Sequence, residues 1–325
     1  MTIFTTILSR LVKAVMTLLA IAVLNFCLLH AAPGDPAVVL AGEAGAADEQ
    51  MIEQLRERFG LDQPLYVQLA KYVGGIVQLD LGYSFRQGAP VIDLIAERLP
   101  ATLILTLTAF GISLVCGIAL GVAAAARVGK PSDSALTTLA LLFYATPLYW
   151  AALMAVLVFS VWLGWLPGFG YETVGANYTG FERVLDILAH LILPALTLGL
   201  FFMAVYMRMT RASMLEVSTA DFVKTAKAKG LSGPVIRRRH ILRNAILPVV
   251  TLAGLQAGQL VGGAVLTETV FAWPGIGRLM FESLAARDYN TILGVFLVSA
   301  AMVILFNIVT DIVYRIVDPR IGARA

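Results

Sequence analysis

The sequence is poor in charged residues and in the side chains from which reactive sites are usually built. Charged residues make up only 14% of the 325 residues, whereas a soluble domain carries about a quarter. There are two cysteines and three histidines, without the spacing of a zinc or disulfide framework. The G-x-x-x-x-G-K-[ST] loop that cradles nucleotide phosphates is also missing. These shortages argue against a soluble enzyme, a metalloprotein and an ATPase.

Long apolar runs are what the sequence has instead. Hydrophobic residues make up 59% of the chain and the mean hydropathy is +0.82. A span needs roughly 20 mostly apolar residues, and runs of this length without period-2 alternation predict helices rather than barrel strands. We therefore expect an all-α membrane protein with six transmembrane helices. The six runs are 11–31, 101–126, 135–163, 189–207, 245–266 and 291–313.

The first run has one alternative interpretation. Arg10 and Lys13 precede it and small residues stand at 31–32, as in a cleaved signal peptide. Its apolar part is longer than a usual signal sequence, and the chain continues as a membrane protein. We therefore predict an uncleaved first helix.

Basic residues are distributed unevenly among the connections. Segment 208–244 holds nine Lys and Arg against two Asp and Glu, whereas 32–100 holds five against ten. The positive-inside rule then predicts that 208–244 and both termini lie in the cytoplasm. The net charge of +3 has a topological explanation and does not indicate a nucleic-acid partner.

The first external connection is the largest and predicts a small helical cap. Its A-P-G-D-P opening should end the first helix, and amphipathic stretches at 48–59, 64–77 and 89–99 predict short helices. A direct contact with substrate and a purely structural plug remain equally open for this cap. The predicted division of the chain is 1–31 for the N-terminus and first helix, 32–100 for the cap, 101–316 for a five-helix core, and 317–325 for a cytoplasmic tail.

Several features inside the runs concern helix packing. Pro147 predicts a kink in the third span. Small residues recur at every fourth position, at 117 and 121 and at 254, 258 and 262, a spacing that lets helix backbones approach closely. Gln256 and Gln259 are polar groups in the fifth span. They either line a translocation path or hydrogen-bond between helices. His190, alone near the start of the fourth span, is interpreted as structural.

Segment 221–248 is the strongest functional signal from the residues alone. Ser218 and Asp221 form an S-x-x-D pair that predicts the start of a short helix, and Gly230 is placed as its C-cap. Ser232 and Pro234 then predict the start of a second helix. An ordinary basic loop on anionic lipid headgroups would explain the charge, but a capped helix with an apolar side is what a rigid docking element requires.

This segment resembles the ATPase-docking motif, the EAA loop, of permease subunits in binding-protein-dependent ABC importers. Residues 224–226 stand at the E-A-A position, where only Ala226 matches, and Gly230 is the motif glycine. Fifteen residues separate Gly230 from Ile246, and Leu247-Pro248 follows Ile246 directly, without the intervening residue of the general I-x-L-P pattern. These departures are typical of the peptide-importer branch, which the chain matches with A-K-G-L-S at 228–232 and R-N-A-I-L-P-V at 243–249.

The resemblance covers nearly the whole chain. The chain is similar to the first permease subunit of dipeptide, oligopeptide and nickel-type importers. It implies the type I ABC importer permease fold. The further matching motifs are A-P-G-D-P at 32–36, R-F-G-L-D-Q-P-L at 58–65, D-L-G-Y-S at 80–84, E-R-L-P-A-T at 97–102, E-T-V-F at 268–271, P-G-I-G at 274–277 and D-P-R at 318–320.

The resemblance also implies partners. A second homologous permease would complete the pore in a bacterial inner membrane, and a periplasmic or lipid-anchored binding protein would deliver the solute. Two ATPase subunits would bind ATP and Mg, so that this chain has no cofactor and no catalytic or metal site of its own. Phe222, Val223 and Ala226 are expected to contact the ATPase, with Lys224 and Lys227 as the polar rim.

Site residues follow from these motifs. The expected coupling residues are Asp221, Phe222, Val223, Lys224, Thr225, Ala226, Lys227, Ala228, Lys229, Gly230, Leu231 and Ser232, and the return toward the membrane uses Arg243, Asn244 and Pro248. The residues expected to contact the binding protein are Glu268, Phe271, Trp273 and Pro274.

Three alternatives of function are weighed. The same machinery is used for nickel complexes, glutathione or sugars, and peptides are the favoured cargo. An ATP-independent secondary transporter or channel would need inverted repeats and intramembrane charges, and neither is evident. A membrane-embedded enzyme would need a catalytic pair at membrane depth, which is also not evident.

Overall fold

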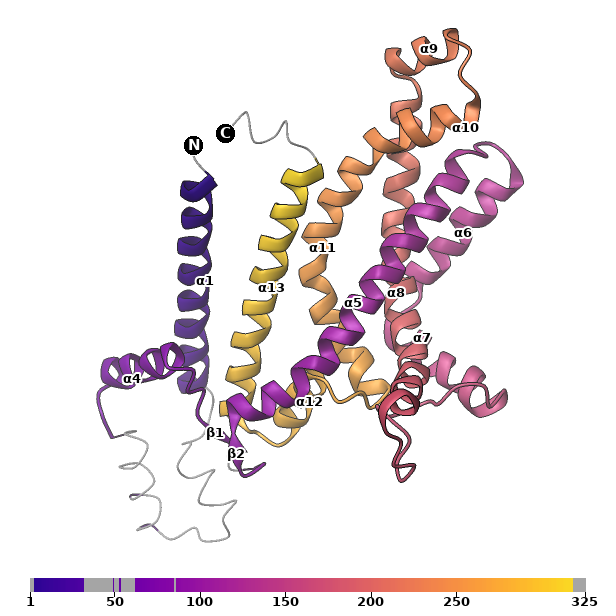
Figure 1. The fold of residues 1–325 in the computed structure, drawn as a ribbon. Coiled ribbons are helices and arrows are strands. Elements are labelled where there is room, and N and C mark those ends of the chain that lie inside the picture. Colours follow the sequence, from indigo (N-terminus) through magenta and orange to yellow (C-terminus); the bar gives the residue numbers. More distant parts are fainter. Residues whose placement is uncertain (1–2, 32–48, 50–52, 54–61, 85, 318–325) are drawn as a thin grey trace. The chain divides into compact units, whose positions relative to one another are not determined.

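The computed structural model describes residues 3–31, 49, 53, 62–84 and 86–317 (Figure 1). These residues are almost entirely helical. The chain divides into two compact units, which are described separately. Unit 1 comprises Met1–Arg98 with Leu279–Ala301, and unit 2 comprises Leu99–Arg278 with Met302–Ala325.

Unit 1 is built around the first helix and the turn before the last one. Its elements are α1 (Ile3–Ala31), α4 (Leu65–Val77), the two-residue antiparallel ladder of β1 (Tyr83–Ser84) and β2 (Ala89–Pro90), the start of α5, most of α12 (Ile276–Ala285) and the first part of α13 (Tyr289–Val317). Asp288 precedes α13 and accepts hydrogen bonds from Ser84 Oγ at 2.5 Å and Thr291 Oγ1 at 2.7 Å. The carboxylate thus caps α13 and ties it to β1.

The predicted helices of the external connection are partly confirmed. The stretch 64–77 corresponds to α4. Of the stretch 89–99, residues 91–99 form the first turns of α5, whereas 89–90 are β2. The helix predicted at 48–59 falls outside the described residues except for 49 and 53. The short β1–β2 ladder was not predicted, since two residues per strand leave no periodic signal.

Unit 2 packs around one long helix, α8 (Gly180–Ser218). Helices α6 (Pro131–Ala145), α7 (Leu148–Ala155) and α11 (Arg243–Val270) all contact it. The core includes Leu105 of α5 (Val91–Ala125), and Leu198 and Tyr206 of α8. The remaining elements of unit 2 are η1 (Val156–Trp162), α9 (Asp221–Ala228), α10 (Gly233–Val235), η2 (Ile236–Leu242), the first residues of α12 and the last part of α13.

The kink predicted at Pro147 is confirmed, and the change of direction is large enough to break the helix in two. The run 135–163 is divided into α6 and the α7–η1 pair, which meet at a bend of 101°. Thr146 is extended, with φ −78° and ψ 129°, because a residue before proline is driven out of the helical region. The run is therefore a broken span or a re-entrant loop.

Three described helices are long and apolar enough to cross a membrane: Val91–Ala125, Gly180–Ser218 and Tyr289–Thr310. The bent pair Pro131–Ala145 and Leu148–Trp162 would make a fourth span. The other two predicted runs lie in α1 and α11, in which some side chains are outside the described set. The count of six, like the division at 31, 100 and 316, stays a prediction.

The predicted close approach at Gly117 and Gly121 is confirmed. A Cβ at Gly117 would lie 2.9 Å from Met203 O, and one at Gly121 would lie 2.7 Å from Met207 O. Because backbone atoms cannot move aside as a side-chain end can, α5 reaches α8 only with glycine at these two positions.

The same spacing on α11 is confirmed in part. Gly254 and Gly258 face Thr310 and Val303 of α13, whereas Gly262 has no atom within 4 Å of an added Cβ. The small-residue spacing thus marks a contact at its first two positions only.

We expect Gly117→Ala to lower stability and Gly111→Ala to preserve or raise it. Both residues are on α5, and in a helix interior alanine is more favourable than glycine by about 1 kcal/mol in helix propensity. A methyl group at 117 must push α8 away, at a cost of about 1–3 kcal/mol, whereas an added Cβ at 111 meets nothing within 4 Å. Thermal unfolding in detergent measures both. Equal melting temperatures for the two variants would contradict the contact.

Candidate functional site

The basic segment begins on a continuous helix. α8 runs to Ser218, well beyond the end of the apolar run at 207, and only Thr219 and Ala220 separate it from α9. Figure 1 shows α9 at one end of unit 2, beyond α10 and the nearby end of α6. The element predicted to dock a partner is therefore carried at the tip of the longest helix of the unit.

The predicted C-terminal cap of α9 is confirmed. Gly230 has φ +75°. Its N–H donates to Lys227 O at 2.9 Å, and Leu231 N–H donates to Ala226 O at 3.3 Å. This is the Schellman arrangement, which needs a left-handed residue just after the helix. No atom lies within 4 Å of an added Cβ at Gly230, so backbone conformation alone requires glycine there.

The predicted N-terminal caps are wrong in detail. Ser218 ends α8 and its Oγ donates to Leu215 O at 2.7 Å, and the N-cap of α9 is Ala220 without a side-chain bond. Ser232 is the N-cap of α10, but its side chain makes no capping bond either. The direct passage from α8 into α9 leaves no room for a capping box.

The inner face of α9 corrects the predicted contact surface. Val223 and Ala226 are buried in a cluster with Met214, Ile236 and Ala245. Residues three apart share one helix face, and this face packs on the chain itself. In this chain Val223 and Ala226 seat α9, so a coupling contact of α9 with a partner falls to its other face.

The outer face of α9 is left for contact with other molecules. Phe222 is 44% exposed, an unusual state for a phenylalanine on a charged helix. Lys224 is also exposed and its Nζ lies 2.8 Å from Asp221 Oδ1. The other exposed residues of this surface are Thr225, Lys227, Ala228, Lys229, Gly230, Leu231 and Ser232.

The return from α9 runs through a π-helical segment. The exposed residues of η2 include Arg237–Arg239. Arg243 and Asn244, at the start of α11, are also exposed. Asn244 Nδ2 donates to His240 O at 2.7 Å. Pro248 lies inside α11. The π-helical segment was not predicted from the sequence.

An ion pair that sequence reasoning missed braces the base of the segment. Arg211 Nε and Nη2 lie 2.8 and 2.7 Å from the two carboxylate oxygens of Asp133, a bidentate geometry. Gly129 N–H also donates to Asp133 Oδ2 at 3.4 Å. The pair ties the first turn of α6 to α8 about two turns before α8 ends. The two residues are 78 apart, so local patterns cannot reveal the contact.

The turn between α11 and α12 is organised by a buried carboxylate. Glu268 is fully buried. Its Oε1 accepts from Thr102 Oγ1 at 2.7 Å, and its Oε2 accepts from the backbone N–H of Gly277 at 2.8 Å and of Arg278 at 3.1 Å. Thr102 Oγ1 in turn accepts from Ile276 N–H at 2.8 Å. These three amides open α12, so Glu268 and Thr102 cap that helix from a distance.

The tight approach of Glu268 explains the two glycines of the P-G-I-G stretch. A Cβ at Gly275 would collide with the Glu268 carboxylate, and one at Gly277 would lie 2.7 Å from Val265 Cα. Trp273 closes the turn, with its indole Nε1 donating to Ala101 O at 2.9 Å.

The placement of this turn corrects a predicted surface. Glu268, Phe271 and Trp273 are at most 1% exposed, and Pro274 is half-buried. In this arrangement the three buried side chains form the interior of the turn and are closed to a second protein. The contact of this turn with a binding protein stays a prediction.

The two glutamines predicted in the fifth span remain unassigned. Gln256 Oε1 is buried without a hydrogen-bond partner among the described residues, and the side chain of Gln259 lies outside the described set. Lining of a path by these residues therefore stays a prediction.

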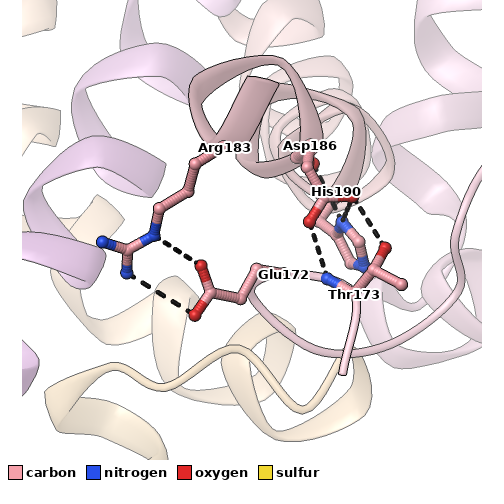
Figure 2. Close-up of polar contacts among 5 residues, drawn as sticks. All are labelled: Glu172, Thr173, Arg183, Asp186 and His190. Atoms are coloured by element: carbon pink, nitrogen blue, oxygen red, sulfur yellow. Dashed lines mark hydrogen bonds and ion pairs between the residues drawn. The ribbon is translucent and has the colours of Figure 1, made fainter. Parts of the chain in front are cut away.

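A second polar cluster rigidifies the loop before α8 (Figure 2). Arg183 Nε lies 2.7 Å from Glu172 Oε2. Asp186 accepts from Thr173 N–H at 2.6 Å and from Thr173 Oγ1 at 2.7 Å. His190 Nδ1 lies 2.9 Å from Asp186 O, within reach of a hydrogen bond. These pairs hold the loop on the first turns of α8, and within the described residues no three His, Cys, Asp or Glu side chains gather as metal ligands.

The fold and these sites define a class: a helical membrane protein with a short, exposed basic helix at one end of its longest helix. The chain belongs to the family described as binding-protein-dependent transport system inner membrane component. The profile of that family matches residues 117–323, and the profile of its N-terminal region, described as binding-protein-dependent transport system membrane component, N-terminal, matches residues 3–106.

Curated relatives match along nearly their full length. The oligopeptide transport system permease protein AppB of Bacillus subtilis is 40% identical, covering 97% of this chain and 98% of that protein. The dipeptide transport system permease protein DppB of Escherichia coli K12 is 40% identical with the same coverage.

Solved structures support the fold. A chain from the inward-facing MetNI methionine ABC transporter superimposes with a TM-score of 0.56, at 18% identity, covering 69% of this chain and 96% of that one. The predicted type I ABC importer permease fold is therefore confirmed at the level of the fold.

We expect Glu268→Ala to lower the free energy of unfolding by about 3–5 kcal/mol. It would leave the Thr102 hydroxyl and two α12 amides without their acceptor, each at about 1–3 kcal/mol. Glu182→Gln, at an exposed site in the first turn of α8, is the matched control and should change stability by no more than about 1 kcal/mol. Denaturation followed by tryptophan fluorescence measures both. A Glu268→Ala loss no larger than the control would refute the capping role.

We expect Asp133→Arg and Arg211→Asp each to reduce solute-stimulated ATP hydrolysis several-fold in the assembled complex. Each single change places like charges together where the bidentate pair stood. The double variant restores opposite charges and should recover most of the activity, which a double-mutant cycle quantifies. Additive losses in the double variant would show that the pair does not act as one brace.

Proposed function

We propose that this chain is one of two permease subunits that together form the translocation pore of an ATP-driven importer of dipeptides or oligopeptides. The observation that carries the proposal is the match of 40% identity over nearly the full length of two peptide-system permeases. The exposed, glycine-capped helix α9 supplies the mechanical element that such a subunit needs.

ATP hydrolysis belongs to separate subunits in this proposal. Two ATPases bind ATP and Mg and receive the outer face of α9. Phe222 fills an apolar pocket of the ATPase, and Lys224 and Lys227 form the rim, where charge favours orientation and encounter. Val223 and Ala226 hold α9 to unit 2 from the opposite face, so a movement of the ATPase displaces α9 as a rigid body.

The connection of α9 to α8 determines which helices move when α9 is displaced. α8 continues directly from α9 into the core of unit 2, and the Asp133–Arg211 pair joins α8 to α6. A push on α9 therefore reaches α6 and α8 together, and biases the inward- and outward-facing arrangements of the pore.

The remaining assignments complete the proposed complex. A second homologous permease forms the other half of the pore, and a periplasmic or lipid-anchored protein delivers the peptide. The chain lies in a bacterial inner membrane with both termini in the cytoplasm, in contact with membrane lipid. The basic excess of 208–244 supports this orientation.

The glycine cap offers a sharp test of coupling. We expect Gly230→Val to abolish most solute-stimulated ATP hydrolysis, since a β-branched residue at φ +75° is strained by about 1–2 kcal/mol or more. Gly230→Asn is the matched control, because asparagine tolerates the left-handed region. Reconstituted complexes of both permeases, the ATPases and the binding protein are assayed with and without peptide.

The outcomes separate docking from folding. Gly230→Val should leave the permease assembled but uncoupled, and Gly230→Asn should retain most of the stimulation. If Gly230→Val is stimulated by peptide as strongly as the parent complex, α9 is not the coupling element.

A further inference from the structure

The arginines that follow α9 form a charged surface separate from the outer face of that helix. Arg238, Arg239 and Arg243 line one pocket together with Pro234 and Val235. All three arginines are exposed. We call these five residues the arginine pocket.

The π-turn is what gathers these side chains. Backbone hydrogen bonds in a π-helix join residues five apart, so Arg238 in η2 and Arg243, the residue just after η2, lie nearer to one side of the segment than they would in an α-helix. In an α-helix, with 3.6 residues per turn, side chains five apart lie on different sides. The unusual helical segment thus converts a run of basic residues into a cluster of guanidinium groups around one depression.

The positive charge of the pocket is not neutralised within the described part of the chain. No ion pair or hydrogen bond joins Arg238, Arg239 or Arg243 to an acidic side chain there. The sequence explains this, since residues 222–267 contain no Asp or Glu. Three adjacent guanidinium groups without a counter-charge repel one another, and an anion with several oxygens would relieve that repulsion by bidentate bonds.

The apolar part of the pocket identifies the kind of anion. Val235 is 41% exposed beside Pro234, and Arg243 is the first residue of α11, whose run from 245 to 266 has no charged residue. The arginines therefore lie at the end of an apolar membrane-type helix, where headgroups meet basic side chains. We propose that the arginine pocket binds the phosphate of an anionic phospholipid, with the glycerol and upper acyl chain against Pro234 and Val235.

The two surfaces of the segment then have different occupants. The outer face of α9, with Phe222, Lys224 and Lys227, receives the ATPase, and the arginine pocket holds lipid at the base of the docking element. The inference rests on the cytoplasmic placement proposed above. Bound lipid would fix η2 against the membrane surface, so that motion of α9 is transmitted into α11 rather than lost in the loop.

The test uses the complete complex of both permeases and the ATPases. It is purified in detergent containing neutral phosphatidylcholine with a small fraction of phosphatidylglycerol, and the retained phosphatidylglycerol is counted per complex by mass spectrometry. The variant Arg238→Gln/Arg239→Gln/Arg243→Gln should weaken phosphatidylglycerol binding by about a hundredfold, because each basic residue near anionic lipid contributes a factor of about five. Arg237→Gln is the matched control, since Arg237 is exposed on the same segment but outside the pocket. It should weaken binding by no more than about fivefold.

Each outcome decides between occupants. Retention of phosphatidylglycerol by the triple variant at the level of Arg237→Gln overturns the inference. Displacement of the lipid by an equal concentration of inorganic phosphate also overturns it, since the pocket would then take a free anion. Loss of the ATPases with lipid retained assigns the arginines to protein docking and overturns it as well.

A substitution with lysine guards against a failure of assembly. Arg238→Lys/Arg239→Lys/Arg243→Lys keeps the charge but loses the bidentate geometry, and should retain less phosphatidylglycerol than the parent and more than the glutamine variant. ATPase stoichiometry is measured on the same samples. A parent complex that fails to hold ATPases contradicts the proposed function, whereas the lipid count alone decides the arginine pocket.

Discussion

Close packing along α8 is the constraint on which unit 2 depends. Apolar helices gain little from one another through the hydrophobic effect when lipid is the alternative solvent, so contact depends on fit between backbones and on buried polar bonds. Gly117 and Gly121 let α5 reach the main chain of α8. The Asp133–Arg211 pair ties α6 to the same helix. α8 is thereby a rigid axis that carries the loop of Figure 2 near its first turns and α9 beyond its last.

The two ends of this unit use polar groups in opposite ways. In the turn after α11, Glu268 is buried and its carboxylate accepts hydrogen bonds from Thr102 and from two α12 amides. Polar groups of the chain itself thus satisfy this carboxylate. In the segment after α9, the arginines are exposed and lack acidic partners in the described chain. Charge satisfied within the chain builds structure, whereas charge left unsatisfied points to a partner outside it.

The proposed docking by α9 depends on the same division between inner and outer faces. A single helix of eight residues has little stability alone in water. Val223 and Ala226 anchor it to Met214 and Ile236, and the Gly230 cap ends it sharply. Only a helix anchored in this way can transmit force as a rigid body, and the exposed Phe222 is then free to be the contact.

Sequence patterns were enough to predict the helices, the basic segment, the glycine that ends α9 and the family, because these depend on local periodicity, composition and short motifs. The break at Pro147 was equally local, since proline constrains the residue before it. Three features emerged from the fold alone: the buried face of α9, the place of Glu268 inside its turn, and the pairing of Asp133 with Arg211. Local sequence patterns hardly indicate such features, because a helix with apolar residues on two faces can pack through either face. The partner that covers one side comes from residues far away in the chain.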